Sequence, residues 1–195
     1  MKKKFDIKEI SKKVDINIDD YSSKKLEQKE ISNENPLYEV LKNQYNDWKN
    51  ITMIALEQSN NKSILLYFMF VTVEIYIKAE LTRNFNIISY DQCIPNFFFN
   101  SPNQQFQLRQ LKHKVKMMLG HVNNNKNNPM FADLKNLIKI RRELEKLKID
   151  KIINNDYTNL RYNCDDKTNF LFLKEENIIS NKEKEKIKEV LKYVM

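Results

Sequence analysis

The most constraining feature of this sequence is an apolar run near its centre, residues 64–81, with charged residues embedded in it. As a helix, the run would be apolar on all sides for about three turns, which is typical of a helix buried among several others. Glu74 and Lys78 lie four residues apart, so a helix places them on one face. We expect these charges to be paired, with each other or with an arginine such as Arg161. Glu74 and Lys78 have two possible roles: they form a structural ion pair, or they line a central cleft.

The scarcity of turn residues favours an all-α fold. Among 195 residues, Gly120 is the single glycine and there are four prolines, fewer turn formers than sheet-rich folds usually need. A glycine-rich phosphate loop is excluded on the same ground. Two cysteines are too few for a disulfide framework and lack zinc-site spacing, so neither a metal nor a cofactor is expected. Charges inside the 64–81 run argue against a membrane span, and a soluble, cytoplasmic protein is predicted.

Apolar periodicity and capping residues predict about five core helices in residues 36–195. They cover residues 36–59, 62–84, 104–119 and 130–150, with a last helix that starts at Ser180. Asn35-Pro36 is typical of a helix start, and Ser180 with Glu183 forms a capping box. Gly120 is predicted to close the third helix in a left-handed conformation.

The segments between these helices are predicted to be irregular. Residues 1–35 form a charged amino-terminal arm, and residues 123–129 are a polar linker. The loop over residues 85–103 carries Phe97, Phe98 and Phe99, which are expected either to fill a groove between helices or to bind a partner. Residues 151–178 show no regular pattern.

The positive charge of the chain is concentrated in one region. The formal net charge is +8, and residues 101–151 hold twelve Lys or Arg against four Asp or Glu. Residues 1–35 are nearly balanced, with nine Lys against eight acidic residues. A local surplus of this kind favours an anionic partner.

A basic strip is predicted on the third helix. Its members are spaced three, four and seven residues from the first, which places them on one helical face, opposite the apolar side. They are Arg109, Lys112, His113 and Lys116. Lysine and arginine neutralise phosphates without reading sequence, and a histidine among them can transfer protons. An ordinary solvated helix face, with a structural histidine, is the alternative.

The order of four motifs resembles that of HEPN domains, over residues 40–195. The first is the Trp48 helix, and the second is the sequence from Val71 to Ala79, which matches the pattern A-x-E-x-x-x-K-A through Glu74 and Lys78. The segment around His113 is similar to the family's K-x-H-x-L helix start. Asn159-Leu-Arg161-Tyr162 resembles the LRY element before its last helix.

This resemblance implies a helical bundle that is commonly dimeric. It also implies RNA or nucleotide as ligand, with Arg161 and Tyr162 added to the basic strip, and a role in phage defence or in toxin–antitoxin pairs with nucleotidyltransferase-like partners. Many members cleave RNA through an Arg followed, after four to six residues, by a His. That motif is absent, because only three residues separate Arg109 from His113. The resemblance therefore favours the branch that binds without cleaving.

Three functions remain open at this point. The first is a dimeric RNA- or nucleotide-binding module without catalysis. The second is an RNase that uses His113 as proton shuttle and Arg109 to stabilise phosphorane charge. The third is an interaction or inhibitor protein of a phage or mobile element, which would bind a protein through the amino-terminal arm and the Phe97–Phe99 loop.

Overall fold

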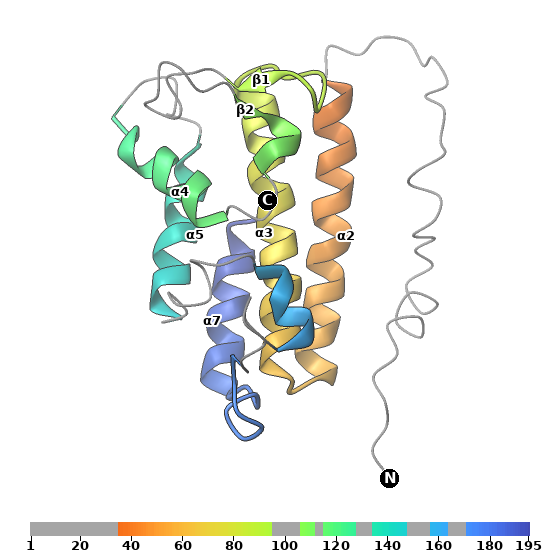
Figure 1. The fold of residues 1–195 in the computed structure, drawn as a ribbon, viewed down its shortest axis with the longest axis vertical. Coiled ribbons are helices and arrows are strands. Elements are labelled where there is room, and N and C mark those ends of the chain that lie inside the picture. Colours follow the sequence, from red (N-terminus) through yellow and green to blue (C-terminus); the bar gives the residue numbers. More distant parts are fainter. Residues whose placement is uncertain (1–34, 95–105, 112–114, 128–133, 148–156, 164–170) are drawn as a thin grey trace. The chain divides into compact units, whose positions relative to one another are not determined.

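The chain is all-α, as the sequence predicts (Figure 1). A computed structural model describes residues 35–94, 106–111, 115–127, 134–147, 157–163 and 171–195. The elements of this described part, in chain order, are α2 (Pro36–Gln58), α3 (Lys62–Asn84), β1 (Cys93–Ile94), β2 (Phe106–Gln107), η3 (Leu108–Leu111), α4 (Val115–Asn124), α5 (Lys135–Lys146), η5 (Tyr157–Tyr162) and α7 (Asn181–Lys192). The two η elements are 3₁₀ helices, and β1 pairs antiparallel with β2.

The first two helices form an antiparallel pair with the predicted bounds. Asn35 caps α2, because its side-chain oxygen accepts hydrogen bonds from the amides of Leu37 (3.0 Å) and Tyr38 (3.2 Å). The short turn after α2 ends at Asn61, whose side chain caps α3 by accepting from the Ile64 amide at 3.2 Å. The predicted helices 36–59 and 62–84 are therefore confirmed.

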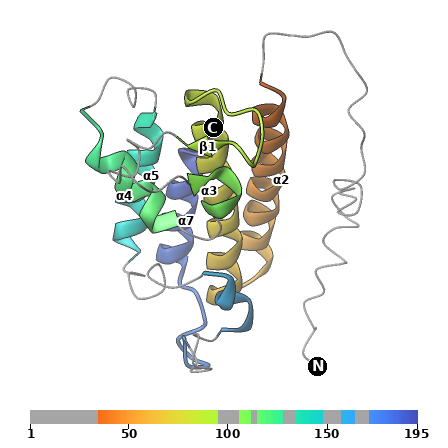
Figure 2. The same ribbon diagram turned by 45° about the horizontal axis from the view of Figure 1, so that its top comes forward.

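Helix α3 is the centre of the core. It contacts α2, α4, α7 and η5, and α2 runs beside it along its length (Figure 2). Burial on all its sides agrees with its apolar sequence. Between α2 and α3, the hydroxyls of Thr52 and Thr72 lie 3.1 Å apart in the buried interface.

The carboxyl end of α3 turns through a left-handed asparagine. Asn86 has a φ of 48°, and the Ile87 amide donates back to the carbonyl of Thr82 at 2.9 Å. These are the features of a Schellman motif, in which glycine is the usual left-handed residue. Ile87 is fully buried after the turn, and its carbonyl accepts from the Asn35 side chain at 2.7 Å.

The third predicted helix is wrong in its bounds. Residues 106–107 form a strand and residues 108–111 a 3₁₀ helix, and residues 112–114 lie outside the described part. The amides of Leu108 and Arg109 donate to the carbonyls of Gln92 and Tyr90 at 3.3 and 3.0 Å, contacts that an α-helix starting at residue 104 would not allow. Gly120 does not end a helix: α4 continues through it to Asn124, and its φ is not positive.

The later helices agree with the predictions in part. Helix α5 is shorter than the predicted 130–150, whose two ends lie outside the described residues. Its predicted core face is buried, at Leu134, Leu137, Leu144 and Leu147. The region 151–178, expected to be irregular, contains η5. The predicted linker 123–129 starts too early, because Asn123 and Asn124 belong to α4. Residues 1–34, residues 128–129 of the linker and the Phe97–Phe99 segment lie outside the described part.

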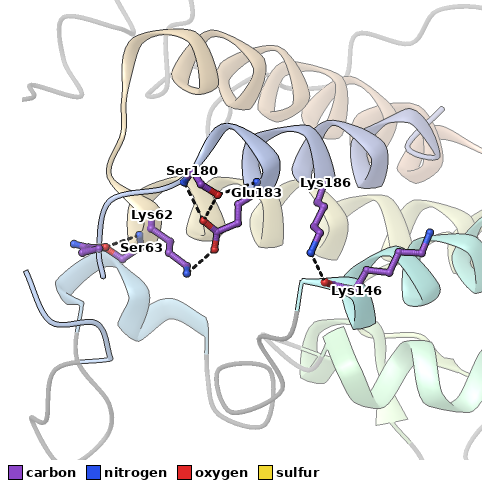
Figure 3. A network of polar contacts seen from close by, with 7 residues as sticks. Lys62, Ser63, Lys146, Ser180, Glu183 and Lys186 are labelled. Atoms are coloured by element: carbon purple, nitrogen blue, oxygen red, sulfur yellow. Dashed lines mark hydrogen bonds and ion pairs between the residues drawn. The ribbon is translucent and has the colours of Figure 1, made fainter. Parts of the chain in front are cut away.

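The start of α7 is joined to two other helices by polar contacts (Figure 3). The capping box is formed: the Glu183 amide donates to the Ser180 hydroxyl at 3.3 Å, and the Glu183 carboxylate accepts from the Ser180 amide at 2.9 Å. Lys62 at the start of α3 lies 2.7 Å from that carboxylate. Lys186 donates to the Lys146 carbonyl, at the end of α5, at 2.8 Å. No helix in the described residues is both long and apolar enough to cross a membrane.

Candidate functional site

Glu74, Lys78 and Tyr157 form a buried polar cluster between α3 and η5. The Lys78 ammonium and the Tyr157 hydroxyl both donate to the Glu74 carboxylate, one to each oxygen. Glu74 is only 6% exposed and Lys78 only 9%, so the pair is largely shielded from water. The spacing of four residues that placed Glu74 and Lys78 on one face accounts for their contact. Their role as the lining of a functional cleft stays a prediction.

Tyr157 is the member of the cluster that the sequence pattern did not single out. Its ring stacks on Phe70, with centroids 5.4 Å apart and an interplanar angle of 22°, and lies 6.0 Å from the ring of Tyr67. A tyrosine four residues before Arg161 was the available signal, but nothing in the sequence placed its hydroxyl beside Glu74.

The geometry of η5 separates its residues into a buried and an exposed set. In a 3₁₀ helix, residues three apart lie on the same side, so Tyr157 and Leu160 are both buried against α3. Arg161 and Tyr162 fall on the exposed side. The element ends at Asn163, which has a left-handed φ of 52°. The Asn163 side chain donates to the Phe172 carbonyl at 2.8 Å and accepts from its amide at 3.1 Å.

Tyr67, Arg161 and Tyr162 form an aromatic ladder at the surface of this junction. The Arg161 guanidinium lies 5.5 Å from the ring centroid of Tyr67 and 5.5 Å from that of Tyr162. Its Nε donates to the Thr158 carbonyl at 3.1 Å, within η5. Tyr162 is 68% exposed, so most of its surface is open to solvent.

The ladder and the buried polar cluster are electrostatically connected through Tyr67. Burial raises the pKa of the Tyr67 hydroxyl; the positive charge of Arg161 opposes this shift, and the negative charge of Glu74 adds to it. The predicted site residues Glu74, Lys78, Arg161 and Tyr162 therefore belong to one region, where η5 packs on α3.

The structure does not place the described residues of the predicted basic strip on one helix. Arg109 lies in η3 and Lys116 in α4, so the two do not share one continuous α-helix. The Arg109 guanidinium lies 3.0 Å from the Asp91 carboxylate, and its Nε donates to the Gln107 side chain at 2.8 Å. Lys112 and His113 lie outside the described residues.

The other histidine, His121, lies in α4, and burial lowers its pKa because desolvation disfavours the charged imidazolium. Within the described ranges, no group of three or more His, Cys, Asp or Glu side chains has an arrangement that could hold a metal ion.

Comparison with family models, with curated proteins and with solved structures yields no match to this chain. The features of this chain that bear on function are therefore the junction between α3 and η5 and the sequence motifs described above.

Proposed function

We propose that this chain is a HEPN-like protein that binds RNA or a nucleotide without cleaving it, in a prokaryotic phage-defence or toxin–antitoxin type system. The observation that carries the proposal is the aromatic ladder. An exposed tyrosine ring offers a face on which a base can stack, and the adjacent guanidinium can pair with a phosphate. The segment that holds both residues is the one that resembles the LRY element.

The contacts of the Arg109 guanidinium favour a binding role over a catalytic one. An RNase that used Arg109 to stabilise a phosphorane would need its guanidinium directed at the reacting phosphate. Here that guanidinium is engaged by Asp91 and Gln107. Arg161, by contrast, contacts two rings and one backbone carbonyl, and none of these neutralises its charge.

The proposal predicts how two substitutions change RNA affinity. With fluorescently labelled single-stranded RNA and full-length protein, fluorescence anisotropy gives the Kd over a series of salt concentrations. Tyr162→Ala is expected to cost about 1–3 kcal/mol of binding energy without changing the salt dependence, because stacking is lost. Arg161→Ala is expected to weaken binding and to lower the slope of log K against log salt by about one unit, because one phosphate contact is lost.

Two matched variants serve as controls. Lys182→Ala removes an exposed cation of α7, outside the basic region 101–151, and Tyr90→Ala removes an exposed tyrosine far from η5 in sequence. Both are expected to bind RNA as the wild type does. Failure of the wild type to bind, or equal losses in the control variants, would refute the proposal. Cleavage of the RNA by the wild type, abolished in an Arg109→Ala/His113→Ala double variant, would instead establish the RNase.

A further inference from the structure

The aromatic ladder depends on how η5 is seated on α3. Among the described residues of η5, Arg161 and Tyr162 are exposed, and the buried contacts are made by Tyr157 and Leu160. Leu160 contributes apolar burial, which has little directional preference. The hydrogen bond from the Tyr157 hydroxyl to Glu74 is directional, so it can define the position of η5 along α3.

Burial makes this hydrogen bond costly to break. Glu74 is a shielded carboxylate, and Tyr157 is itself buried. If η5 shifted on α3, Glu74 would lose a donor in a place where water cannot readily replace it, and an under-satisfied buried charge is strongly unfavourable. The bond therefore penalises displacement of η5 more than the stacking on Phe70 alone would.

The 3₁₀ backbone transmits that position to the ladder. Arg161 is four residues after Tyr157, and its Nε is tied to the Thr158 carbonyl one residue beyond the tyrosine. At the other end, Asn163 holds the segment by two hydrogen bonds to Phe172. A change in the position of Tyr157 would therefore move the guanidinium relative to the ring of Tyr67.

We propose that Tyr157 is a positioning residue for the ligand site: its hydrogen bond to Glu74 sets the place of η5 on α3 and thereby presents Arg161 and Tyr162 to the ligand. This inference rests on the proposed RNA-binding function for its ligand, but its structural part can be tested without RNA. Tyr157 does not itself touch the ligand in this scheme.

Tyr157→Phe tests the proposal, because it keeps the ring and removes only the hydroxyl. In the full chain we expect the Kd for single-stranded RNA to rise about fivefold to tenfold, the size of one net hydrogen bond. We also expect faster hydrogen exchange, without RNA, in a peptide that spans residues 157–163, with unchanged exchange in α2. Glu74→Gln is a second variant: it leaves one acceptor oxygen for the two donors Lys78 and Tyr157, so we expect a smaller change in the same direction.

Tyr45→Phe is the matched control. It removes another tyrosine hydroxyl, which donates to the Met195 carbonyl at 2.7 Å, at a site on α2. If the hydroxyls were only structural, RNA affinity would respond alike in both variants. We expect urea unfolding to show a loss of stability for both, larger for Tyr157→Phe because its acceptor is charged, whereas only Tyr157→Phe loses RNA affinity.

A combined variant separates positioning from an independent effect. If Tyr157 acts through Tyr162, then adding Tyr157→Phe to Tyr162→Ala should cost much less than adding it to the wild type. Full additivity, or a Tyr157→Phe protein that binds as Tyr45→Phe does, would overturn the inference while leaving the RNA-binding proposal intact. If the wild type binds no RNA, the proposed function fails, and the exchange of residues 157–163 alone decides: no acceleration in Tyr157→Phe would refute the positioning role.

Discussion

At the scale of single residues, asparagine takes the conformation that glycine usually takes. Two described non-glycine residues have positive φ, Asn86 and Asn163, and each ends a helical element. Asparagine tolerates the left-handed region better than other side chains, because its short polar group bonds locally. In the part of the chain that the structure describes, the two left-handed turns therefore depend on asparagine, and the prediction that Gly120 would serve this purpose was wrong.

Substitutions at Asn86 test whether asparagine takes the place of glycine in this left-handed turn. Asn86→Ala should destabilise the protein by about 1 kcal/mol, because alanine is strained in the left-handed region and cannot bond locally. Asn86→Gly should be as stable as the wild type or more so, because glycine adopts that region freely. Urea unfolding measures both. An alanine variant as stable as the glycine variant would show that the φ of Asn86 is not what limits this turn.

The residues of the candidate site were predictable only where a spacing of three or four applies. Glu74 and Lys78 share a helix, so their contact follows from sequence separation alone. Tyr157 lies 83 residues from its partner Glu74, and no local pattern relates residues so far apart. The same holds for Arg161 and Tyr67, which meet only because η5 packs on α3.

At the scale of elements, the helices that begin with a capping residue were predicted most closely. Asn35-Pro36 and the Ser180 capping box mark helix starts, because each satisfies amides that a helix leaves unpaired. The segment before α4 was predicted wrongly because Leu108 and Leu111 are three residues apart, a spacing that suits a 3₁₀ turn as well as an α-helix. The strand pair β1–β2 is too short to show an alternating pattern.

The capping box of α7 predicts a pH dependence of stability. Burial alone would raise the pKa of Glu183, but hydrogen bonds from Lys62 and Ser180 outweigh it and hold the pKa below its ordinary value of 4.5. Because the folded pKa is depressed, the carboxylate stabilises the fold fully above pH 4.5 and loses this contribution as the pH falls through the folded pKa. At pH 7, Glu183→Gln should be less stable than the wild type by up to about 1 kcal/mol.

The difference in unfolding free energy between the wild type and Glu183→Gln should disappear as the pH is lowered below 4.5. Urea unfolding at a series of pH values measures this difference. Glu185→Gln is the control, because that carboxylate is more exposed and pairs with Lys188 at the surface. It should show little difference from the wild type at any pH. A gap for Glu183→Gln that stays constant with pH would contradict the assignment of the effect to this charge.

At the scale of the whole molecule, the core is organised around α3, which the apolar run predicted. Its partners could not be predicted, because an all-round apolar helix does not specify which neighbour lies on which side. The segment just after α7 is an example: Lys49 of α2 donates to the Val194 carbonyl at 2.6 Å across 145 residues of sequence.

Native-state hydrogen exchange should show the central position of α3. Amides in the middle of α3 are expected to exchange only through global unfolding, because every side of that helix is covered. Amides of α4 should exchange through smaller openings. The comparison is between the exchange free energy of each peptide and the unfolding free energy from urea. Exchange of α3 by local opening would mean that the core is not organised around it.

The late position of α7 in the chain also bears on biosynthesis. The last core helix starts at Asn181, although the apolar helix that it covers ends at Asn84. With translation at about 5–20 residues per second, the roughly 100 residues between them take on the order of 5–20 s to synthesise. During that interval, α3 leaves the ribosome without one of its covering helices. In a nascent chain, the apolar surface of α3 that α7 covers is therefore expected to stay exposed, and open to non-native contacts, until α7 emerges.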